Sequence, residues 1–270
     1  MALNRGASTI EHAGSYLLIL TPLFMVAIGG YLFALPTAIG DELANEGAGQ
    51  LPDLVILGAS LDPNSGTGML GTYIIIALLV GVCSILWHAY WLAWTQHAVK
   101  GFSVRHYLTK YWIRIYPLLW ATSSEALSAP LNLYLVKKHF PQVSSEVRRL
   151  VVGMGSYLSI NGTLIAVFVF AGAVAKISGA EISLLQLLFA VPLVFLLGYS
   201  VPGLPSELLL FAGPLATFLG IGEPALSAFL PLYIGLQVGL SDSFRTGNNS
   251  TDDCLFALQI QAACDERRLT

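Results

Sequence analysis

The sequence predicts an all-α protein that crosses a membrane several times and contains interrupted helices. Of its 270 residues, 55% are apolar and 11% are charged, and the mean hydropathy is +0.70. Soluble domains carry about 25% charged residues, so this composition is typical of a polytopic membrane protein. Two pairs of short apolar pieces surround polar tips, which predicts helical hairpins. The uncharged runs, of which all but the last are long enough to cross a bilayer, are residues 13–40, 63–99, 150–175, 182–206 and 224–241.

The first region, residues 1–104, is expected to hold two transmembrane helices, at about 15–35 and 68–94. Residues 40–65 between them carry acids and no Lys or Arg, whereas residues 100–114 carry four basic side chains. Basic loops stay in the cytoplasm, so we expect cytoplasmic termini, an extracytoplasmic 40–65 loop and a multi-pass protein of the cell (inner) membrane. The first apolar run is too long for a cleaved signal. The aromatic residues near the inner end of the second helix indicate an interfacial belt: Trp87, Tyr90, Trp91 and Trp94.

The transport-core region, residues 105–270, opens with a predicted hairpin at 105–140. Its apolar pieces, 111–121 and 127–136, are each too short to span a bilayer, and basic residues flank both outer ends. A segment with both ends on one side is re-entrant, and its tip TSSEA must be buried in protein or line a cavity. The alternative is one long helix interrupted at Pro130, which would reverse the topology of everything that follows.

A second set of interrupted segments follows. Residues 146–176 are expected to form a broken helix around SINGT, residues 159–163, where free carbonyls would coordinate a cation; a simple glycine kink is the alternative. A second hairpin is predicted at 182–222, around the tip YSVPGLPSE, where two Pro and one Gly stop a continuous helix. Paired interruptions of this kind predict a transporter built from inverted repeats, with its site at the repeat interface.

The last predicted helix, residues 224–263, carries a polar stripe in the stretch LSDSFRTGNNSTDD. Its members share one helical face because their spacing is i, i+3, i+7 and i+11. A charge at bilayer depth costs a few kcal/mol, so such residues pair with each other or mark a substrate or ion path. The alternative is a solvated helix end, because Gly247, Asn248 and Asn249 break helices. The stripe consists of Asp242, Arg245, Asn249 and Asp253.

These motifs resemble those of the dicarboxylate/amino acid:cation symporter family, the glutamate transporter homologues. The resemblance rests on TSSEALSAP, on INGT against the family's N-M/L-D-G-T, on YSVPGLPS, and on DSFRTGNNSTDD against D-x-x-R-T-x-x-N-x-x-x-D. It covers about residues 15–263, but only the C-terminal part of the family pattern, from its fifth helix onward. It implies an inverted-repeat, elevator-type fold, and either a minimal member, a homotrimer or a second chain that supplies scaffold helices.

The resemblance also implies roles for individual residues. Arg245 would clamp a side-chain carboxylate, Asp242 would accept an ammonium group, and Thr246 and Asn249 would add neutral hydrogen bonds. The hairpin tips would hold an α-carboxylate, and one further hydroxyl would face the same pocket. These tip and hydroxyl residues are Ser123, Ser124, Leu204, Pro205 and Thr163.

Sodium is the coupling ion that the resemblance implies, and no other cofactor is expected. Gly155, Asn249 and Asp253 would form one site. Ser159 and Asn161 stand where the family has Asn and Asp, which predicts weaker ion sites. The two tip acids, Glu125 and Glu207, are candidates to carry protons if they are buried; solvated tip side chains are the alternative.

Two functions follow as hypotheses. The first is a secondary transporter, or its substrate-binding core, for an acidic amino acid or dicarboxylate, driven by Na⁺ or H⁺. The second is a non-transporting membrane subunit, or a degenerate paralogue, that needs a partner chain. An enzyme is least supported, because the five His are scattered without metal-ligand or triad spacing. The three Cys show no ligand spacing either. The expected partners are membrane lipid and a small acidic substrate, with no nucleic acid.

Overall fold

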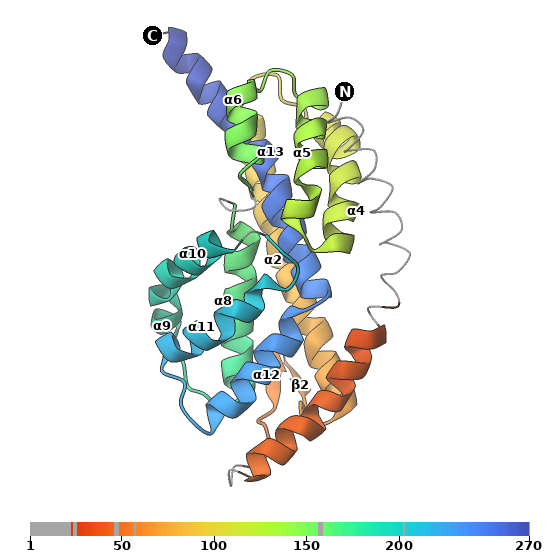
Figure 1. Cartoon of the computed structure of the whole chain (residues 1–270), viewed down its shortest axis with the longest axis vertical. Coiled ribbons are helices and arrows are strands. Elements are labelled where there is room, and N and C mark those ends of the chain that lie inside the picture. The colour runs from red at the N-terminus through yellow and green to blue at the C-terminus, as the bar shows by residue number, and fades with distance from the viewer. Residues whose placement is uncertain are drawn as a thin grey trace.

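Two long helices form the axis of the molecule. The computed structural model describes Leu23 and residues 26–45, 49–56, 58–155, 159–201 and 203–269, and most of this part is helical. Helix α2 (Gly66–Ala98) lies against helix α13 (Leu240–Leu269) over much of their length (Figure 1). Within the described residues, α2 is the one helix that is long and apolar enough to cross a membrane by itself. The remaining helices pack around this pair.

The prediction of one continuous last helix over residues 224–263 is wrong. This region forms two helices, α12 (Ala225–Gln237) and α13, which together are apolar enough to span but bend by 62° at their junction. Gly239 adopts a φ of +72° there, which a side chain would disfavour. The Tyr73 hydroxyl on α2 donates to the Val238 carbonyl (3.0 Å) and accepts from the Leu240 amide (2.8 Å). Tyr73 therefore satisfies the backbone groups that the break exposes.

The first helix reaches further than expected, over residues 26–45. Leu32, Leu35, Ile39 and Leu43 are buried at helical spacing, so the apolar face continues past the predicted end at residue 35. Of the predicted residues 15–25, all but Leu23 lie outside the described part. The expected acidic loop contains two short antiparallel strands, β1 (Leu54–Ile56) and β2 (Ala59–Leu61), paired with Leu54 opposite Leu61.

A helical hairpin follows α2. Its first arm runs through α3 (Val104–His106), a π-helical segment η1 (Tyr107–Trp112) and α4 (Ile113–Thr122); its second arm is α5 (Glu125–His139). The chain reverses at Ser123, which has a φ of 46°, and the Ser124 side chain caps α5 by accepting from the Leu127 amide. Pro130 lies inside α5. The alternative prediction, one long helix interrupted at Pro130, is therefore wrong, because the break falls at the serine tip.

The second set of elements is also interrupted. After α6 (Ser145–Val147) and η2 (Arg148–Val152), the helix stops, and α8 (Asn161–Ile177) begins anew within SINGT, so a simple kink in a continuous helix is wrong. Next come α9 (Leu184–Phe189) and α10 (Val191–Ser200), before the second tip, and η3 (Glu207–Phe211) and α11 (Ala212–Leu219), after it.

The apolar side chains form two separate cores along the α2–α13 axis. One includes Phe170, Phe211 and Phe229, from α8, η3 and α12. The other includes Tyr107 and Leu135, from η1 and α5, and the C-terminal half of α13 from Cys254 onward. Phe244 packs on the first core and Cys254 belongs to the second. The polar stripe of α13 therefore lies at the boundary between the two cores.

Candidate functional site

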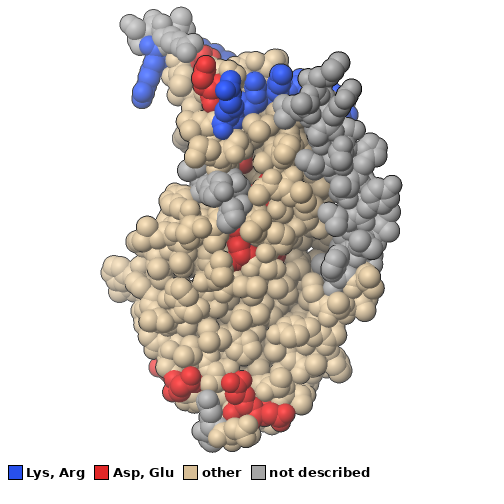
Figure 2. Space-filling model, in the orientation of Figure 1, with Lys and Arg blue, Asp and Glu red and all other residues tan. Residues whose placement is uncertain are grey.

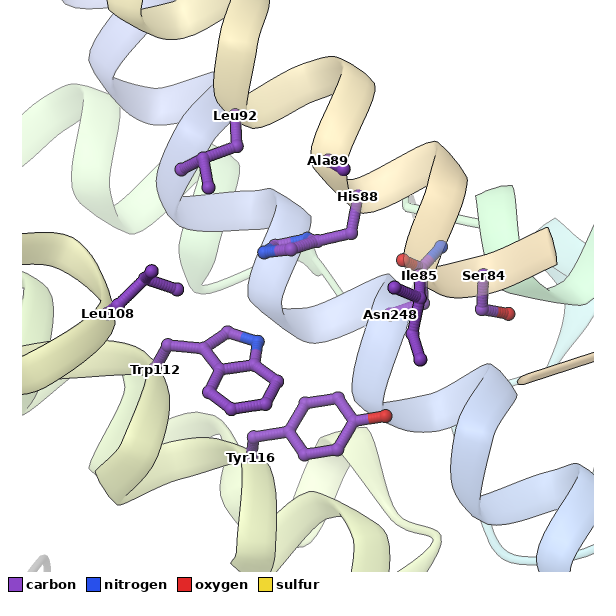
Figure 3. Close-up of a pocket in the computed structure, with 9 residues that line it drawn as sticks. All are labelled: Ser84, Ile85, His88, Ala89, Leu92, Leu108, Trp112, Tyr116 and Asn248. Atoms are coloured by element: carbon purple, nitrogen blue, oxygen red, sulfur yellow. The ribbon is translucent and has the colours of Figure 1, made fainter. Parts of the chain in front are cut away.

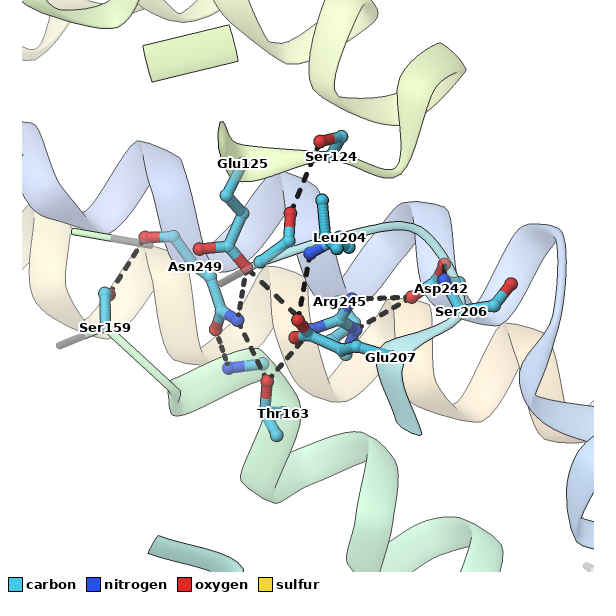
Figure 4. Close-up of polar contacts among 12 residues, drawn as sticks. Ser124, Glu125, Ser159, Thr163, Leu204, Ser206, Glu207, Asp242, Arg245 and Asn249 are labelled. Carbon is cyan, nitrogen blue, oxygen red and sulfur yellow. Dashed lines mark hydrogen bonds and ion pairs between the residues drawn. The ribbon is translucent and has the colours of Figure 1, made fainter. Parts of the chain in front are cut away.

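Arg245, in the second turn of α13, is at the centre of the polar stripe and is fully buried. Its Nε and Nη2 donate to Oδ1 of Asp242, one turn earlier, at 2.9 and 2.7 Å (Figure 4). Its Nη1 donates to the Thr163 hydroxyl at 3.1 Å and forms an ion pair with Glu207. The alternative of a solvated helix end is wrong for this stretch, because Asp242, Arg245, Asn249 and Asp253 are all buried.

The acids at the two hairpin tips face inward. Glu125 is 2% exposed and Glu207 is 8% exposed, so the interpretation as solvated tip residues is wrong. Each stands at the first position of the helical segment after its tip, and the side chain reaches the guanidinium of Arg245. The Glu125 Oε1 lies 3.8 Å from Arg245 Nη1 and accepts from Asn249 Nδ2 at 2.9 Å. Three carboxylates therefore surround one buried guanidinium.

The two tips meet each other directly. The Gly203 carbonyl of the second tip accepts from the Glu125 amide (3.0 Å) and from the Ser124 hydroxyl (3.3 Å) of the first tip. The Leu204 amide donates to Glu207 Oε2 at 3.0 Å, and the Ser206 amide donates to Asp242 Oδ2 at 2.7 Å. Tip donors that the family resemblance assigns to a substrate carboxylate are thus used within the chain in this conformation.

A cavity of about 620 Å³ opens beside the tips. Its size falls within the range of about 300–1,000 Å³ that small-molecule sites occupy. Asp242 lies at its boundary, and Arg245 is not among its lining residues. The Ser123 and Ser243 hydroxyls, 3.2 Å apart, also line it. Its other polar and tip residues are Thr122, Ser124, Pro205 and Ser206.

Asn249 ties α13 to the start of α8. Its Oδ1 accepts from the Gly162 amide at 2.6 Å, and its Nδ2 donates to the Thr163 hydroxyl at 3.0 Å. A Cβ at residue 162 would overlap the main-chain carbonyl of Arg245, so this close approach requires glycine. Thr246 is buried, but its hydroxyl has no hydrogen-bond partner in the described part of the chain, and it takes no part in the cluster around Arg245.

Asp253 is the residue that best fits a cation site. Its carboxylate is buried and forms no ion pair with a basic side chain of the described residues. It lies against Gly155 so closely that a Cβ there would overlap it. Ser159 is adjacent: its hydroxyl donates to the Asn249 carbonyl at 2.9 Å and its amide to the Gly155 carbonyl at 2.8 Å. One carboxylate among neutral oxygens suits a hard cation such as Na⁺.

Asn161 does not lie beside Asp253 but contacts Asp252, which in turn contacts His88. Neither of these two contacts was predicted from the sequence. The Nδ2 of Asn161 is 3.3 Å from Asp252 Oδ2, and Asp252 Oδ1 is 2.6 Å from His88 Nδ1 on α2. The Nε2 of His88 is 3.3 Å from the Tyr107 hydroxyl. The sequence signal was an imidazole in the middle of a long uncharged run. Of the residues predicted to bind sodium, Gly155, Ser159 and Asp253 therefore lie together. The side-chain amides of Asn161 and Asn249 form hydrogen bonds with other residues instead.

A second, smaller pocket of about 180 Å³ lies next to His88, between α2, η1, α4 and α13 (Figure 3). Leu108, Trp112 and Tyr116 form one wall, and Leu92 and Ile85 another. These walls are almost wholly apolar. The pocket is therefore distinct in chemistry from the charged cluster around Arg245.

One comparison with known proteins identifies the family. The model of the sodium:dicarboxylate symporter family matches residues 56–263, which is most of the chain. The matched range includes both segments that were predicted as hairpins and the whole polar stripe. No individual curated protein matches the chain. The chain belongs to the sodium:dicarboxylate symporter family, whose members are integral membrane transporters and not enzymes.

Proposed function

We propose that this protein moves an acidic amino acid or a dicarboxylate across a membrane, with Na⁺ or H⁺ as the coupling ion. The observation that carries the proposal is the position of Arg245, which is fully buried where both hairpin tips meet the last helix. A guanidinium presents a planar fork that matches a carboxylate, and a buried charge at membrane depth typically marks a substrate path.

The neighbours of Arg245 favour an amino acid over a simple dicarboxylate. Asp242 is both a partner of Arg245 and a boundary residue of the 620 Å³ cavity, which supports a role for its carboxylate as the acceptor of an ammonium group. Ser123 and Ser124 line the same cavity. Their hydroxyls would bind a second carboxylate once Ser124 releases the Gly203 carbonyl. For the substrate to reach Arg245, its side-chain carboxylate would replace that of Glu207.

The charge balance of the site supports cation coupling. Arg245 offsets one of the three carboxylates around it, and Asp253 adds a fourth buried carboxylate. Uncompensated charge in a low-dielectric interior is costly, so protons or metal cations must offset the excess. Asp253, the carbonyls of Gly155 and Asn249, and the Ser159 hydroxyl would hold Na⁺ and supply that positive charge. Glu125 and Glu207 are the candidate proton carriers.

The membrane arrangement belongs to the same proposal. Both hairpins would enter and leave from their own side of the bilayer, with their tips near mid-depth, and both termini would be cytoplasmic. The burial of Glu125 and Glu207 supports deep tips. Substrate would cross by an elevator-type movement of the core, residues 105–270, with scaffold helices supplied by copies in a homotrimer or by a second chain.

Uptake into proteoliposomes tests the proposal. Labelled aspartate and succinate are offered to the full chain under a sodium gradient, a proton gradient or neither. We expect aspartate uptake that depends on one of the gradients and that is abolished in Arg245→Ala. The matched control is Arg149→Ala, because Arg149 is exposed and takes no part in the ion pairs around Arg245. Uptake by Arg245→Ala equal to the parent would overturn Arg245 as the clamp.

A second candidate function is a non-transporting membrane subunit. The observation that favours it is that every nitrogen of Arg245 already has an acceptor within the chain, as a purely structural ion pair would. This candidate predicts no aspartate binding at millimolar concentration by a protein that remains folded. Aspartate binding that is lost in Arg245→Ala excludes it.

A further inference from the structure

Basic side chains gather at one end of the molecule. On the face shown in Figure 2, the visible Lys and Arg lie at the end formed by the outer ends of the first hairpin, with an acidic patch beside them, and further exposed acids cluster at the opposite end. Between Asp62 and Glu146 the sequence contains one acid, Glu125, and its side chain is buried at Arg245. The basic residues of this stretch therefore lack acidic neighbours along the chain.

Three of these residues, which we call the cationic cluster, lie within about two helical turns of the point where the two arms touch: Lys110 and Arg114 on the first arm and Lys138 on the second. His106, Lys110 and Arg114 are spaced by four along the first arm, so they form one stripe. The two arms are joined at this point, because His106 Nε2 donates to the His139 carbonyl at 3.1 Å and their rings lie 5.8 Å apart.

The electrostatic environment of His139, at the outer end of α5, supports the proximity of these basic residues. Burial lowers the pKa of His139, and the positive charges of Lys138, Arg114, His106 and Lys110 lower it further. Charges from both arms thus act on the same imidazole. No acid pairs with Lys110, Arg114 or Lys138 among the described residues.

The cluster lies where an apolar surface ends. Ile113, beside Arg114, is 59% exposed, and Leu108, two residues before Lys110, is 38% exposed. Lys138 extends over the Tyr134 ring, with its Nζ 5.5 Å from the ring centroid. Apolar side chains that face acyl chains, next to cations that reach outward, are typical of the depth at which lipid phosphates lie.

We propose that the cationic cluster binds the phosphate headgroup of an anionic phospholipid. One phosphate would contact Lys110 and Arg114 from the first arm and Lys138 from the second, while an acyl chain follows the exposed surface at Ile113. The lipid holds the outer ends of both arms together and anchors the hairpin whose tip carries Glu125.

Lipid binding to the purified full chain tests this proposal. Native mass spectrometry measures the affinity for phosphatidylglycerol, with phosphatidylcholine and inorganic phosphate as separate probes. The triple variant Lys110→Gln, Arg114→Gln, Lys138→Gln is compared with Lys100→Gln, Lys137→Gln, Arg149→Gln, which loses the same charge. Lys100 lines a surface hollow with Asp265 and Glu266, so it has acids nearby.

We expect the cluster variant to lose at least about tenfold in phosphatidylglycerol affinity, and the control to lose about threefold at most. Equal losses, or equal binding of phosphatidylcholine by the parent, would overturn the proposal. Competition by inorganic phosphate as strong as by the lipid would overturn the assignment to a lipid. If circular dichroism shows that the cluster variant is unfolded, Arg114→Gln against Arg149→Gln decides by the same criterion.

Discussion

Glu207, at the start of η3, and Arg245, in α13, form a buried ion pair that closes the site between the second hairpin tip and the last helix. Because Glu207 occupies Nη1 of Arg245, it is the group that an acidic substrate would have to displace. The position of the second tip therefore depends on whether Glu207 is ionised and paired with Arg245.

Glu207→Gln keeps the shape of the side chain and removes its charge. The carboxylate of aspartate then meets less competition at Arg245, so we expect its affinity to rise about tenfold, which equals about 1.4 kcal/mol. Isothermal titration calorimetry in detergent measures this. Glu181→Gln, at an exposed position, is the matched control. Unchanged or weaker binding by Glu207→Gln would show that no substrate carboxylate takes the place of Glu207.

Gly155→Ala should remove the response to sodium. A Cβ at residue 155 would overlap the Asp253 carboxylate and displace it from the candidate cation site. For the parent, Na⁺ at ten times its Kd adds about 1.4 kcal/mol, which raises the melting temperature by about 3–5 °C relative to choline. We expect no such rise in Gly155→Ala. The control is Gly213→Ala, because no atom lies within 4 Å of a Cβ there. A sodium response retained in Gly155→Ala argues against this site.

His88→Leu should destabilise the protein strongly. It leaves the buried Asp252 carboxylate without its basic partner, 2.6 Å away in the structure. Breaking a buried pair by removing one member costs about 3 kcal/mol, or about 6–12 °C in melting temperature. Thermal unfolding of His88→Leu, Asp252→Asn and the double variant gives the coupling. His97→Leu is the control, since His97 is exposed on the same helix. Additive losses in the double variant contradict a direct pair.

The acidic end of the molecule offers a test by pH. The Asn64 side chain and main-chain amide donate to Asp62 Oδ1, both at 2.9 Å, and hold the pKa of Asp62 below its ordinary value of 3.8. These bonds therefore stabilise the fold above the unfolded pKa, and the stabilisation is lost as the pH falls through the lower, folded pKa.

In Asn64→Ala the side-chain bond is absent, so we expect the pKa of Asp62 to rise toward its ordinary value. NMR titration of carboxyl-labelled Asp follows it in micelles. Asn45→Ala, at an exposed position of the helix over residues 26–45, serves as the control. An unchanged titration midpoint in Asn64→Ala would rule out the side-chain bond as a cause.

Local patterns predicted the features that depend on neighbouring residues. The serine tip interrupts the first hairpin where TSSEA stands, because Ser124 caps the second arm and Ser123 turns the chain. The spacing of Asp242, Arg245, Asn249 and Asp253 placed them on one buried face of a helix. The break between α12 and α13 was not predicted, since it depends on Tyr73, 165 residues before Val238.

The sequence by itself determined the membrane class, the interrupted helices and the polar stripe, because composition and spacing express what a segment does alone. The family followed from the resemblance of its motifs and from the match of the family model over residues 56–263. Only the tertiary structure decided which partners the stripe has. Glu207 is 38 residues from Arg245, Glu125 is 124 residues from Asn249, and His88 is 164 residues from Asp252. Periodicity shows which side chains share a face, but the pairing of buried charges follows from how distant segments pack. In this protein that packing brings Asp242 and Glu207 into contact with the guanidinium of Arg245.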